Sequence, residues 1–403
     1  MSESSQDKQD IVVFLGAGFS HDAGLPVMSE FGQKSRSDNR GLWEHASAQY
    51  ATSNFRYAAP MLVEAAEVFK RFQQFCRASP TLRDNDVDNM ETVFCIAEAM
   101  FEANLKRIEF DGQEYAIEEL IRQIQLWLWK AFQVCPPLDN KRRDQINTES
   151  YTRFFKSLSQ LGLCNRLAVI TTNYDLMFEY FSWKNEMPCH YPVVQAEPIS
   201  IGGGIDPFVF LNSGDSDLAK GPLLCKLHGS INYFQDESSD NRLYVANLLG
   251  GGEPIGKSGA EHWKDKPVIF AVDSIWCIRN KHGSGVTPAI IPPTYAKLTQ
   301  QKWLRAIWEE AFEVLSTARK IMFIGYSMPD SDGFMRALIH SAMATRAASV
   351  DSVVPPKVYV IDPNEDTHKR YEGLFHEIYK PLPPINFSEA TKSVIPEILG
   401  EQN

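Results

Sequence analysis

Closely spaced cysteines are missing from this chain. It has 403 residues and seven cysteines, and no two of the cysteines form a C-x-x-C pair. A four-cysteine zinc site is built from such pairs, so we expect no zinc. The spacing also excludes a small disulfide-stabilised scaffold, and scattered cysteines are typical of the reducing cytoplasm.

Long apolar runs and an excess of basic residues are missing too. No run approaches the ~20 residues that span a bilayer, and the N-terminal segment MSESSQDKQD is polar, unlike a signal peptide. The 40 Lys and Arg residues are outnumbered by 51 Asp and Glu residues, which gives a net charge of −11. This charge disfavours direct binding to nucleic acid or to an anionic membrane. We therefore expect a cytoplasmic protein that binds neither.

Short apolar runs, by contrast, recur along the chain. Continuous runs favour buried parallel strands, because such strands have no exposed face on which polar residues would alternate. The six runs are Ile11–Leu15, Leu167–Ile170, Leu223–Leu227, Val268–Val272, Ile321–Ile324 and Val358–Ile361. An amphipathic pattern from Trp303 to Leu315 predicts a helix before one of them. This alternation predicts an α/β fold with a Rossmann-like, doubly wound parallel sheet, whose ligands bind at the carboxyl ends of the strands.

The stretch between the first two predicted strands has a different character. Apolar residues at helical spacing run from Leu62 to Cys76, from Val93 to Phe101 and from Ile117 to Phe132. We predict a mostly helical insertion module at residues 31–149, which interrupts a discontinuous Rossmann-like domain of residues 1–30 and 150–403. Trp127 and Trp129 widen the apolar face of the third helix, and either burial on two sides or a subunit contact explains them.

Glycines cluster directly after the first predicted strand. The segment contains Gly16, Ala17, Gly18, Phe19 and Ser20, followed by Gly24 and Pro26. Glycines let the backbone approach a pyrophosphate, and the N-terminus of the next helix offers free N–H groups. The ordinary dinucleotide fingerprint G-x-G-x-x-G is not met, because position 21 is His. The segment predicts phosphate binding, and the alternative is a glycine-rich tight turn.

Polar residues follow the next two strands of the predicted sheet. The segment TTNYD contains Thr172, Asn173 and Asp175, and the segment KLHGS contains His228. The Asn173 amide can orient a ribose hydroxyl or a water, and Asp175 can stabilise positive charge that develops on a sugar. His228 can act as a general base near neutral pH. The alternative is that these residues cap helices or pack in the core.

The last two predicted strands also end in polar segments. These are GYS, with Gly325 and Ser327, and DPN, with Asp362 and Asn364. Acidic and amide side chains bind ribose hydroxyls, so both segments can hold the adenosine half of a dinucleotide.

Taken in order, the five segments resemble the motifs of the sirtuin superfamily. Sirtuins carry GAG-x-S with a following G-x-P, then T-x-N-x-D, a catalytic HG, G-[TS]-S and an Asn-bearing strand end. The segments GYSMPDSD and IPPTYAK resemble the sirtuin-like NADases of bacterial antiphage defence more than the deacylases. Only Cys277 lies between His228 and Gly325, so the zinc module of classical sirtuins is absent. Because that module helps to build the acyl-lysine groove, its absence disfavours deacylation and leaves NAD cleavage untouched.

The resemblance implies that NAD is bound as a substrate, with its pyrophosphate over residues 16–20. The nicotinamide ribose would lie beside the catalytic residues Asn173 and His228, with Asp175 in support. Transfer to water would give nicotinamide and ADP-ribose, the reaction of an NAD glycohydrolase. The resemblance also implies NAD depletion in antiphage defence (abortive infection), restrained in a homo-oligomer or by a partner. Fewer than twenty residues follow Pro384, so we expect a separate partner, such as a HerA-type hexameric ATPase, rather than a fused sensor.

Two other functions stay open on the sequence. The first is an NAD-dependent protein deacylase or ADP-ribosyltransferase, for which nicotinamide release would depend on a target peptide. The second is a non-catalytic sensor of NAD or ADP-ribose, which would bind its ligand without turnover.

Overall fold

We describe the chain from a computed structural model. It describes residues 9–23, 25, 59–83, 87, 90–133, 148–187, 189–192, 197–198, 200–201, 221–236, 243–245, 249–250, 268–269, 278–279, 286–291, 302–329, 332–348 and 354–401. No helix among these residues is both long enough and apolar enough to cross a membrane.

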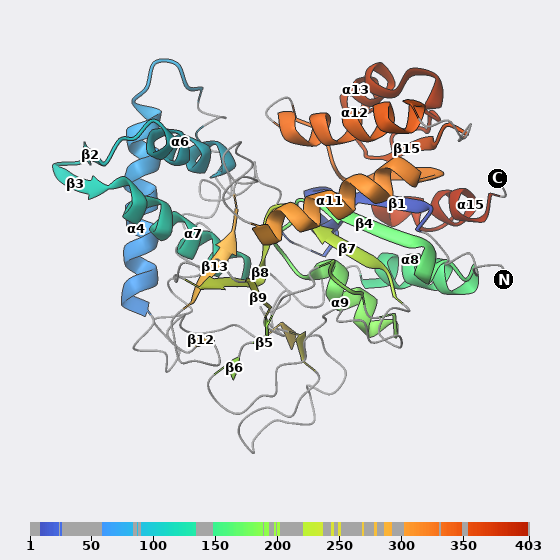
Figure 1. Cartoon of the computed structure of the whole chain (residues 1–403), viewed down its shortest axis with the longest axis horizontal. Helices are drawn as coiled ribbons and strands as arrows, with labels where there is room; N and C mark the ends of the chain where they lie inside the picture. The colour runs from blue at the N-terminus through green and yellow to red at the C-terminus, as the bar shows by residue number, and fades with distance from the viewer. Residues whose placement is uncertain are drawn as a thin grey trace.

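A five-stranded parallel sheet forms the centre of the fold (Figure 1). Its strands are β1 (Ile11–Leu15), β4 (Leu167–Thr171), β7 (Leu223–Lys226), β14 (Lys320–Ile324) and β15 (Lys357–Ile361). Their spatial order is β15-β14-β1-β4-β7. The chain winds outward from β1 to β7 and then returns to β14 on the other side of β1. This is the doubly wound order, and its topological switch point lies between β1 and β14.

The strands are buried along nearly their whole length, which explains why continuous apolar runs mark them in the sequence. Five of the six predicted strands are confirmed in this sheet. The prediction for Val268–Val272 is wrong: β11 (Val268–Ile269) pairs antiparallel with β10 (Leu249–Gly250) in a separate two-stranded sheet. An apolar run specifies that a segment is buried, but it does not specify the strand with which it pairs.

Helices pack on both sides of the sheet. Figure 1 shows α11 (Lys302–Thr317), α12 (Gly333–Ala348) and α13 (Glu365–Phe375) above it, and α8 (Thr148–Gln160) and α9 (Met177–Lys184) below it. The C-terminal helices α14 (Phe387–Ala390) and α15 (Val394–Gly400) pack against α8. Other short helices in the described part of the chain are α1 (Ala17–His21) and the 3-10 turns η3 (Cys164–Arg166) and η7 (His376–Ile378).

The chain between β1 and β4 is mostly helical where it is described. The three predicted amphipathic helices are present as α4 (Ala59–Arg77), α6 (Met90–Glu102) and α7 (Ile117–Gln133). They carry a hairpin that the prediction missed, β2 (Arg107–Phe110) with β3 (Gln113–Ala116). Its turn is Asp111-Gly112, and both residues have positive φ, as a two-residue hairpin turn requires. The proposed domain boundaries stay a prediction.

A second, four-stranded sheet joins the helical part to the central sheet. Its order is β13 (Val286–Ile290), β8 (Gly229–Asp236), β9 (Leu243–Val245) and β5 (Glu197–Pro198), and a further pair joins β12 (Ile278–Arg279) to β6 (Ser200–Ile201). Helix α7 contacts β8 and β13, where the Trp129 indole N–H donates to the carbonyl of Ile231 at 2.8 Å. Trp127 and Trp129 are only 7% and 1% exposed, so burial within the chain accounts for both tryptophans.

Candidate active site

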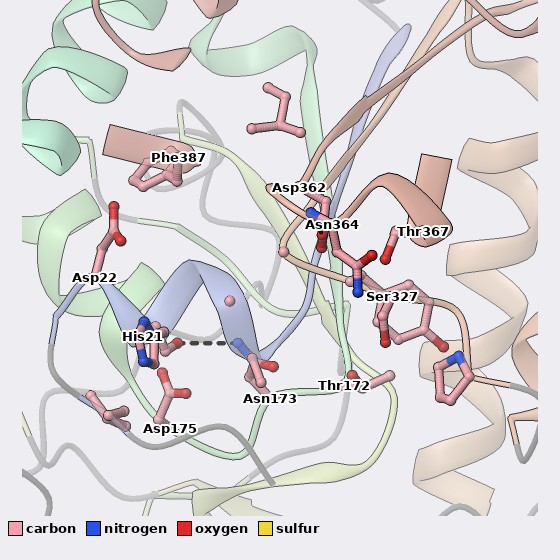
Figure 2. A pocket seen from close by; sticks show the side chains of 18 of the residues that line it. His21, Asp22, Thr172, Asn173, Asp175, Ser327, Asp362, Asn364, Thr367 and Phe387 are labelled. Carbon is pink, nitrogen blue, oxygen red and sulfur yellow. Dashed lines mark hydrogen bonds between the residues drawn. The ribbon is translucent and has the colours of Figure 1, made fainter. Parts of the chain in front are cut away.

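A cavity of about 580 Å³ lies at the carboxyl edge of the central sheet, beside the switch point between β1 and β14. The segments that follow β1, β4, β7, β14 and β15 all contribute to its wall (Figure 2). Its volume is that of a typical ligand or cofactor site. The location agrees with the rule that open α/β sheets bind ligands at the switch point.

Most of the predicted site residues line this cavity. They are Ala17, Gly18, Ser20, Thr172, Asn173, Asp175, His228, Gly325, Ser327, Asp362 and Asn364. Gly16 and Phe19 do not line it, and Gly24 and Pro26 lie outside the described residues. The structure thus brings the five sequence segments together, while the role of each residue stays a prediction.

The glycines let the segments after β1 and β14 touch. The Gly18 N–H donates to the carbonyl of Gly325 at 2.9 Å. A Cβ on Gly16 would lie 2.4 Å from the Gly325 oxygen, and one on Gly325, whose φ is +59°, would lie 2.5 Å from the Gly18 carbonyl carbon. No larger residue fits at these positions without moving backbone, so close packing of the two segments explains the glycines without a ligand.

The side chain of Phe19 belongs to the core, and its predicted role in cofactor binding stays a prediction. Its ring is 1% exposed and packs against Tyr151 and Phe387, with ring centroids 5.0 Å away in both cases. An aromatic ring in the first turn after β1 contributes more by filling the core than by lining a polar cavity.

Asn173 is held in place by the segment after β1. Its Nδ2 donates to the Gly16 carbonyl at 2.9 Å and to Ser20 Oγ at 3.1 Å, and Figure 2 shows this amide between the glycine segment and Thr172. Thr171 strengthens the link, because its hydroxyl donates to the Leu15 carbonyl and accepts from the Asn173 N–H. The side chain of Asn173 therefore has a fixed orientation at the cavity wall.

Asp175 and His228 lie on the same wall and are both buried, at 6% and 3% exposure. One carboxylate oxygen of Asp175 accepts from the Met177 N–H at 2.9 Å and so caps α9. The backbone of His228 is fixed by the Ile291 N–H, which donates to its carbonyl at 2.9 Å. The Tyr174 ring lies 6.3 Å from the imidazole between ring centroids.

The opposite end of the cavity is formed by the residues after β15. Burial raises the pKa of Asp362, and its Oδ1 accepts from the Asn364 N–H at 2.8 Å. Asn364 Oδ1 accepts from the Asp366 N–H at 2.9 Å and caps α13. The capping role that the sequence left open is therefore real for Asn364, as it is for Asp175.

Several residues of the wall were not predicted as site residues. They include His21, Asp22, Phe132, Tyr326, Asp332, Asn386 and Phe387. Burial raises the pKa of Asp22, and the Tyr326 hydroxyl donates to the Asp332 carboxylate. His21 and Asp22 directly follow the glycine segment in the sequence, so their position is a signal from which they could have been predicted. Asn386 and Phe387 follow the last strand at a distance and carry no such signal.

Among the charged side chains of the described wall, carboxylates predominate. It contains Asp22, Asp175, Asp332 and Asp362, together with two histidines, and no Lys or Arg among the residues that the structure describes. Such a wall favours a ligand that carries positive charge, whereas an anionic group would depend on backbone N–H groups and neutral donors. No set of three His, Cys, Asp or Glu residues in the described part of the chain is arranged to hold a metal ion.

Comparison with known proteins identifies the family. The chain matches the family described as SIR2-like domain over residues 167–380. It belongs to this family. The SIR2-like match begins at β4 and includes Asn173, Asp175 and His228, whereas the glycine segment after β1 precedes it. Membership of the SIR2-like family suggests an NAD-utilising enzyme.

Solved sirtuin structures are similar to this SIR2-like chain. One, described as a complex of Sir2 with the inhibitor EX-527, 2'-O-acetyl-ADP-ribose and a deacetylated p53 peptide, has 11% identity and a TM-score of 0.38, and covers 96% of this chain and 93% of that chain. Another, a complex of Sir2 with a p53 peptide and NAD+, has 12% identity and a TM-score of 0.36, with 96% and 92% covered. No curated protein matches the chain.

Proposed function

We propose that this SIR2-like chain is an NAD glycohydrolase, which cleaves the bond between nicotinamide and ribose. The observation that carries the proposal is the shared wall of one cavity. There Asn173, Asp175 and His228, which follow β4 and β7, line the same cavity, and Asn173 is anchored to the glycine segment. Nicotinamide in NAD+ is a cationic ring, and it suits a wall in which carboxylates are the described charges.

The reaction demands little proton transfer to the leaving group. The glycosidic electron pair leaves with nicotinamide, which becomes neutral, while positive charge develops on the ribose. Asn173 would orient the ribose or the attacking water, and Asp175 would stabilise the developing charge. His228 would accept a proton from the water as the new C–O bond forms. NAD+ and water thus give nicotinamide, ADP-ribose and one proton.

The rest of the cavity suits the remainder of the dinucleotide. The pyrophosphate would lie over residues 16–20, where backbone N–H groups are the donors. The adenosine half would extend toward Ser327, Asp362 and Asn364, with Thr172 at the wall between the two halves.

Two active-site variants and one control test this assignment. Purified Asn173→Ala and His228→Ala proteins are expected to fold and to release nicotinamide at least about 100-fold more slowly than wild type. The control is His340→Ala, because His340 is exposed on α12 and is expected to keep the wild-type rate. Wild-type turnover in both site variants contradicts the proposal.

The same assay separates the alternatives. Nicotinamide release that requires an acetylated peptide identifies a protein-modifying enzyme, and release without peptide identifies the glycohydrolase. Calorimetric binding of NAD or ADP-ribose without any turnover identifies a sensor.

We also propose that the enzyme depletes NAD in antiphage defence and acts in the cytoplasm. The support is the resemblance of the GYSMPDSD and IPPTYAK segments to defence NADases, and the cost that constant NAD depletion would impose on a cell. Restraint in a homo-oligomer or by a partner, such as a HerA-type hexameric ATPase, follows from that cost. NAD consumption by the chain alone and with the product of the adjacent gene tests this: turnover must change with the partner or with the oligomeric state.

A further inference from the structure

A buried lysine lies next to the candidate site without lining its cavity. Lys226 is the last residue of β7, two positions before His228, and is 1% exposed. Its ion-pair partner is Glu179 of α9, which is 2% exposed, with 2.8 Å between Nζ and Oε1. Taking both charges out of water has a large free-energy cost, so the fold must satisfy them closely.

The hydrogen bonds of this pair reach the proposed catalytic segment. Lys226 Nζ also donates to the carbonyl of Asp175. Glu179 Oε1 accepts a second bond, from the Tyr191 hydroxyl at 2.9 Å, and that hydroxyl accepts from Asn232 Nδ2 at 3.2 Å. Burial raises the pKa of Tyr191 well above its ordinary value, so the phenol keeps its proton and remains a donor.

The position of these bonds gives the lysine a role beyond charge pairing. Asp175 belongs to the segment after β4 and His228 to the segment after β7, and backbone pairing of these two strands ends at Thr171 and Lys226. Beyond that point the Ile231 N–H donates to the Tyr174 carbonyl at 3.0 Å, and Lys226 adds a side-chain bond to the carbonyl of the next residue, Asp175. We propose that Lys226 is a positioning residue, which holds Asp175 at its place relative to His228. The inference rests on the proposed function of those two residues.

A stability role alone predicts a different response to mutation. Replacing a buried ion pair by uncharged groups of similar size is often neutral or stabilising, whereas removing one partner is strongly destabilising. Lys226→Met alone leaves Glu179 buried and unpaired, so it confounds stability with position. Glu179→Gln leaves the Lys226 charge without its partner and is expected to lower the Tm, but it keeps the lysine bond to the Asp175 carbonyl and an oxygen to accept from Tyr191, so its kcat can be measured below that Tm. Adding Lys226→Met to Glu179→Gln then removes the bond to Asp175 without leaving a lone charge.

Lys320 offers a matched control. It is a buried lysine, 3% exposed, in the first position of β14 at the amino end of the same sheet. Its Nζ donates to the carbonyls of Ile398 and Glu401, at the end of the sheet opposite the cavity. Lys320→Met is therefore expected to lower the Tm and to leave kcat within about threefold of wild type.

The test compares nicotinamide release by Glu179→Gln, by the double variant Glu179→Gln with Lys226→Met, and by Lys320→Met, each below its Tm. We expect Glu179→Gln to retain kcat within about threefold. The double variant is expected to lose at least about tenfold in kcat with little change in KM, because displaced catalytic groups slow the reaction. If the double variant does not fold, Lys226→Arg replaces it, since the longer planar guanidinium cannot reproduce the lysine geometry, and the same fall in kcat is expected. Equal kcat in Glu179→Gln, which keeps Lys226, and in the double variant, which lacks it, overturns the inference.

A second measurement separates this inference from the proposed function. The imidazole resonances of His228, assigned by their loss in His228→Ala, are expected to move in the double variant and to stay in place in Lys320→Met. If the wild-type protein releases no nicotinamide with or without its proposed partner, the proposed function is wrong. The His228 resonances are then the test of the positioning role of Lys226. Unmoved resonances in the double variant then overturn the positioning role.

Discussion

Gly229 gives the sharpest test of how the fold holds the candidate site. It directly follows His228 and has a φ of +77°, which costs an L-residue about 1–2 kcal/mol. A Cβ at this position would lie 1.9 Å from the carbonyl oxygen of Ala289, where ordinary contact begins at 3.4 Å. Gly229→Ala therefore pushes β13 and the residues after β7 apart by about 1.5 Å.

That displacement breaks bonds on both sides of His228. The bond from the Ile291 N–H to the His228 carbonyl and the bond from the Tyr174 hydroxyl to the Ile291 carbonyl, 2.9 and 3.0 Å long, lie beside the clash. At about 1 kcal/mol each, their loss brings the total to about 3–4 kcal/mol. We expect the Tm to fall by about 4–5 °C, and nicotinamide release below that Tm to slow about 100-fold as the imidazole moves.

The control for this experiment is Gly373→Ala. Gly373 lies in α13, and a Cβ there meets nothing within 4 Å, so alanine is expected to stabilise the helix by about 1 kcal/mol. Circular dichroism gives the two Tm values and a nicotinamide assay gives the rates. A Gly229→Ala protein with wild-type Tm and wild-type turnover would show that the close approach of β13 does not hold His228.

Three further predictions concern other parts of the cavity wall. Phe387→Ala is expected to destabilise the protein by about 3–5 kcal/mol, because this ring is 4% exposed and packs against Phe19 and Tyr151; thermal unfolding checks it, with Phe387→Leu as the milder control. Asn364→Ala is expected to cost about 1 kcal/mol through loss of the α13 cap, whereas Asn364→Asp keeps the cap; a fall in NAD affinity that the aspartate variant shares would show a ligand contact through the amide, whereas a fall confined to the alanine variant would act through α13. Burial raises the pKa of Asp22, so the folded state holds this proton more tightly than the unfolded chain, and that stability is lost as pH rises through the folded pKa. Asp22→Asn is therefore expected to gain stability over wild type as the pH rises above about 4, and a difference in Tm that stays constant or shrinks with rising pH would refute the sign.

The central sheet could be predicted from the sequence because strands that are buried on both faces are continuous apolar runs. Five continuous apolar runs are strands of one parallel sheet, and the polar segments after them meet at one edge. The apolar run at Val268 shows the limit of this pattern, since its first two residues pair antiparallel with Leu249–Gly250 in a separate sheet. Pairing depends on contacts that lie far apart in the sequence, and hydrophobic patterning within one run does not encode them.

The candidate site could be predicted only where chemistry and strand ends coincide. Asn173 and His228 follow strands directly, and both line the cavity. Phe387 carries no local signal, since it reaches the wall through packing of the C-terminal helices against α8. Asp111-Gly112 shows the reverse case, because this pair is a hairpin-turn signal in the sequence, although the helical patterns on either side of it are stronger.

The polar residues at the strand ends show that capping and catalysis are compatible assignments. Asp175 caps α9 through Oδ1, and its carbonyl accepts from Lys226. Asn173 binds the glycine segment through Nδ2, which turns the amide into a rigid group at the cavity wall. A catalytic side chain must be held within a fraction of an ångström of its productive position. Hydrogen bonds of this kind already hold it there before the ligand binds, so binding costs no further side-chain entropy. A hydrogen bond that looks purely structural is therefore what a site of this kind requires. Removing such a bond should lower kcat in a protein that still folds. The variants at Lys226 and Gly229 test this expectation, because kcat is measured below the Tm of each.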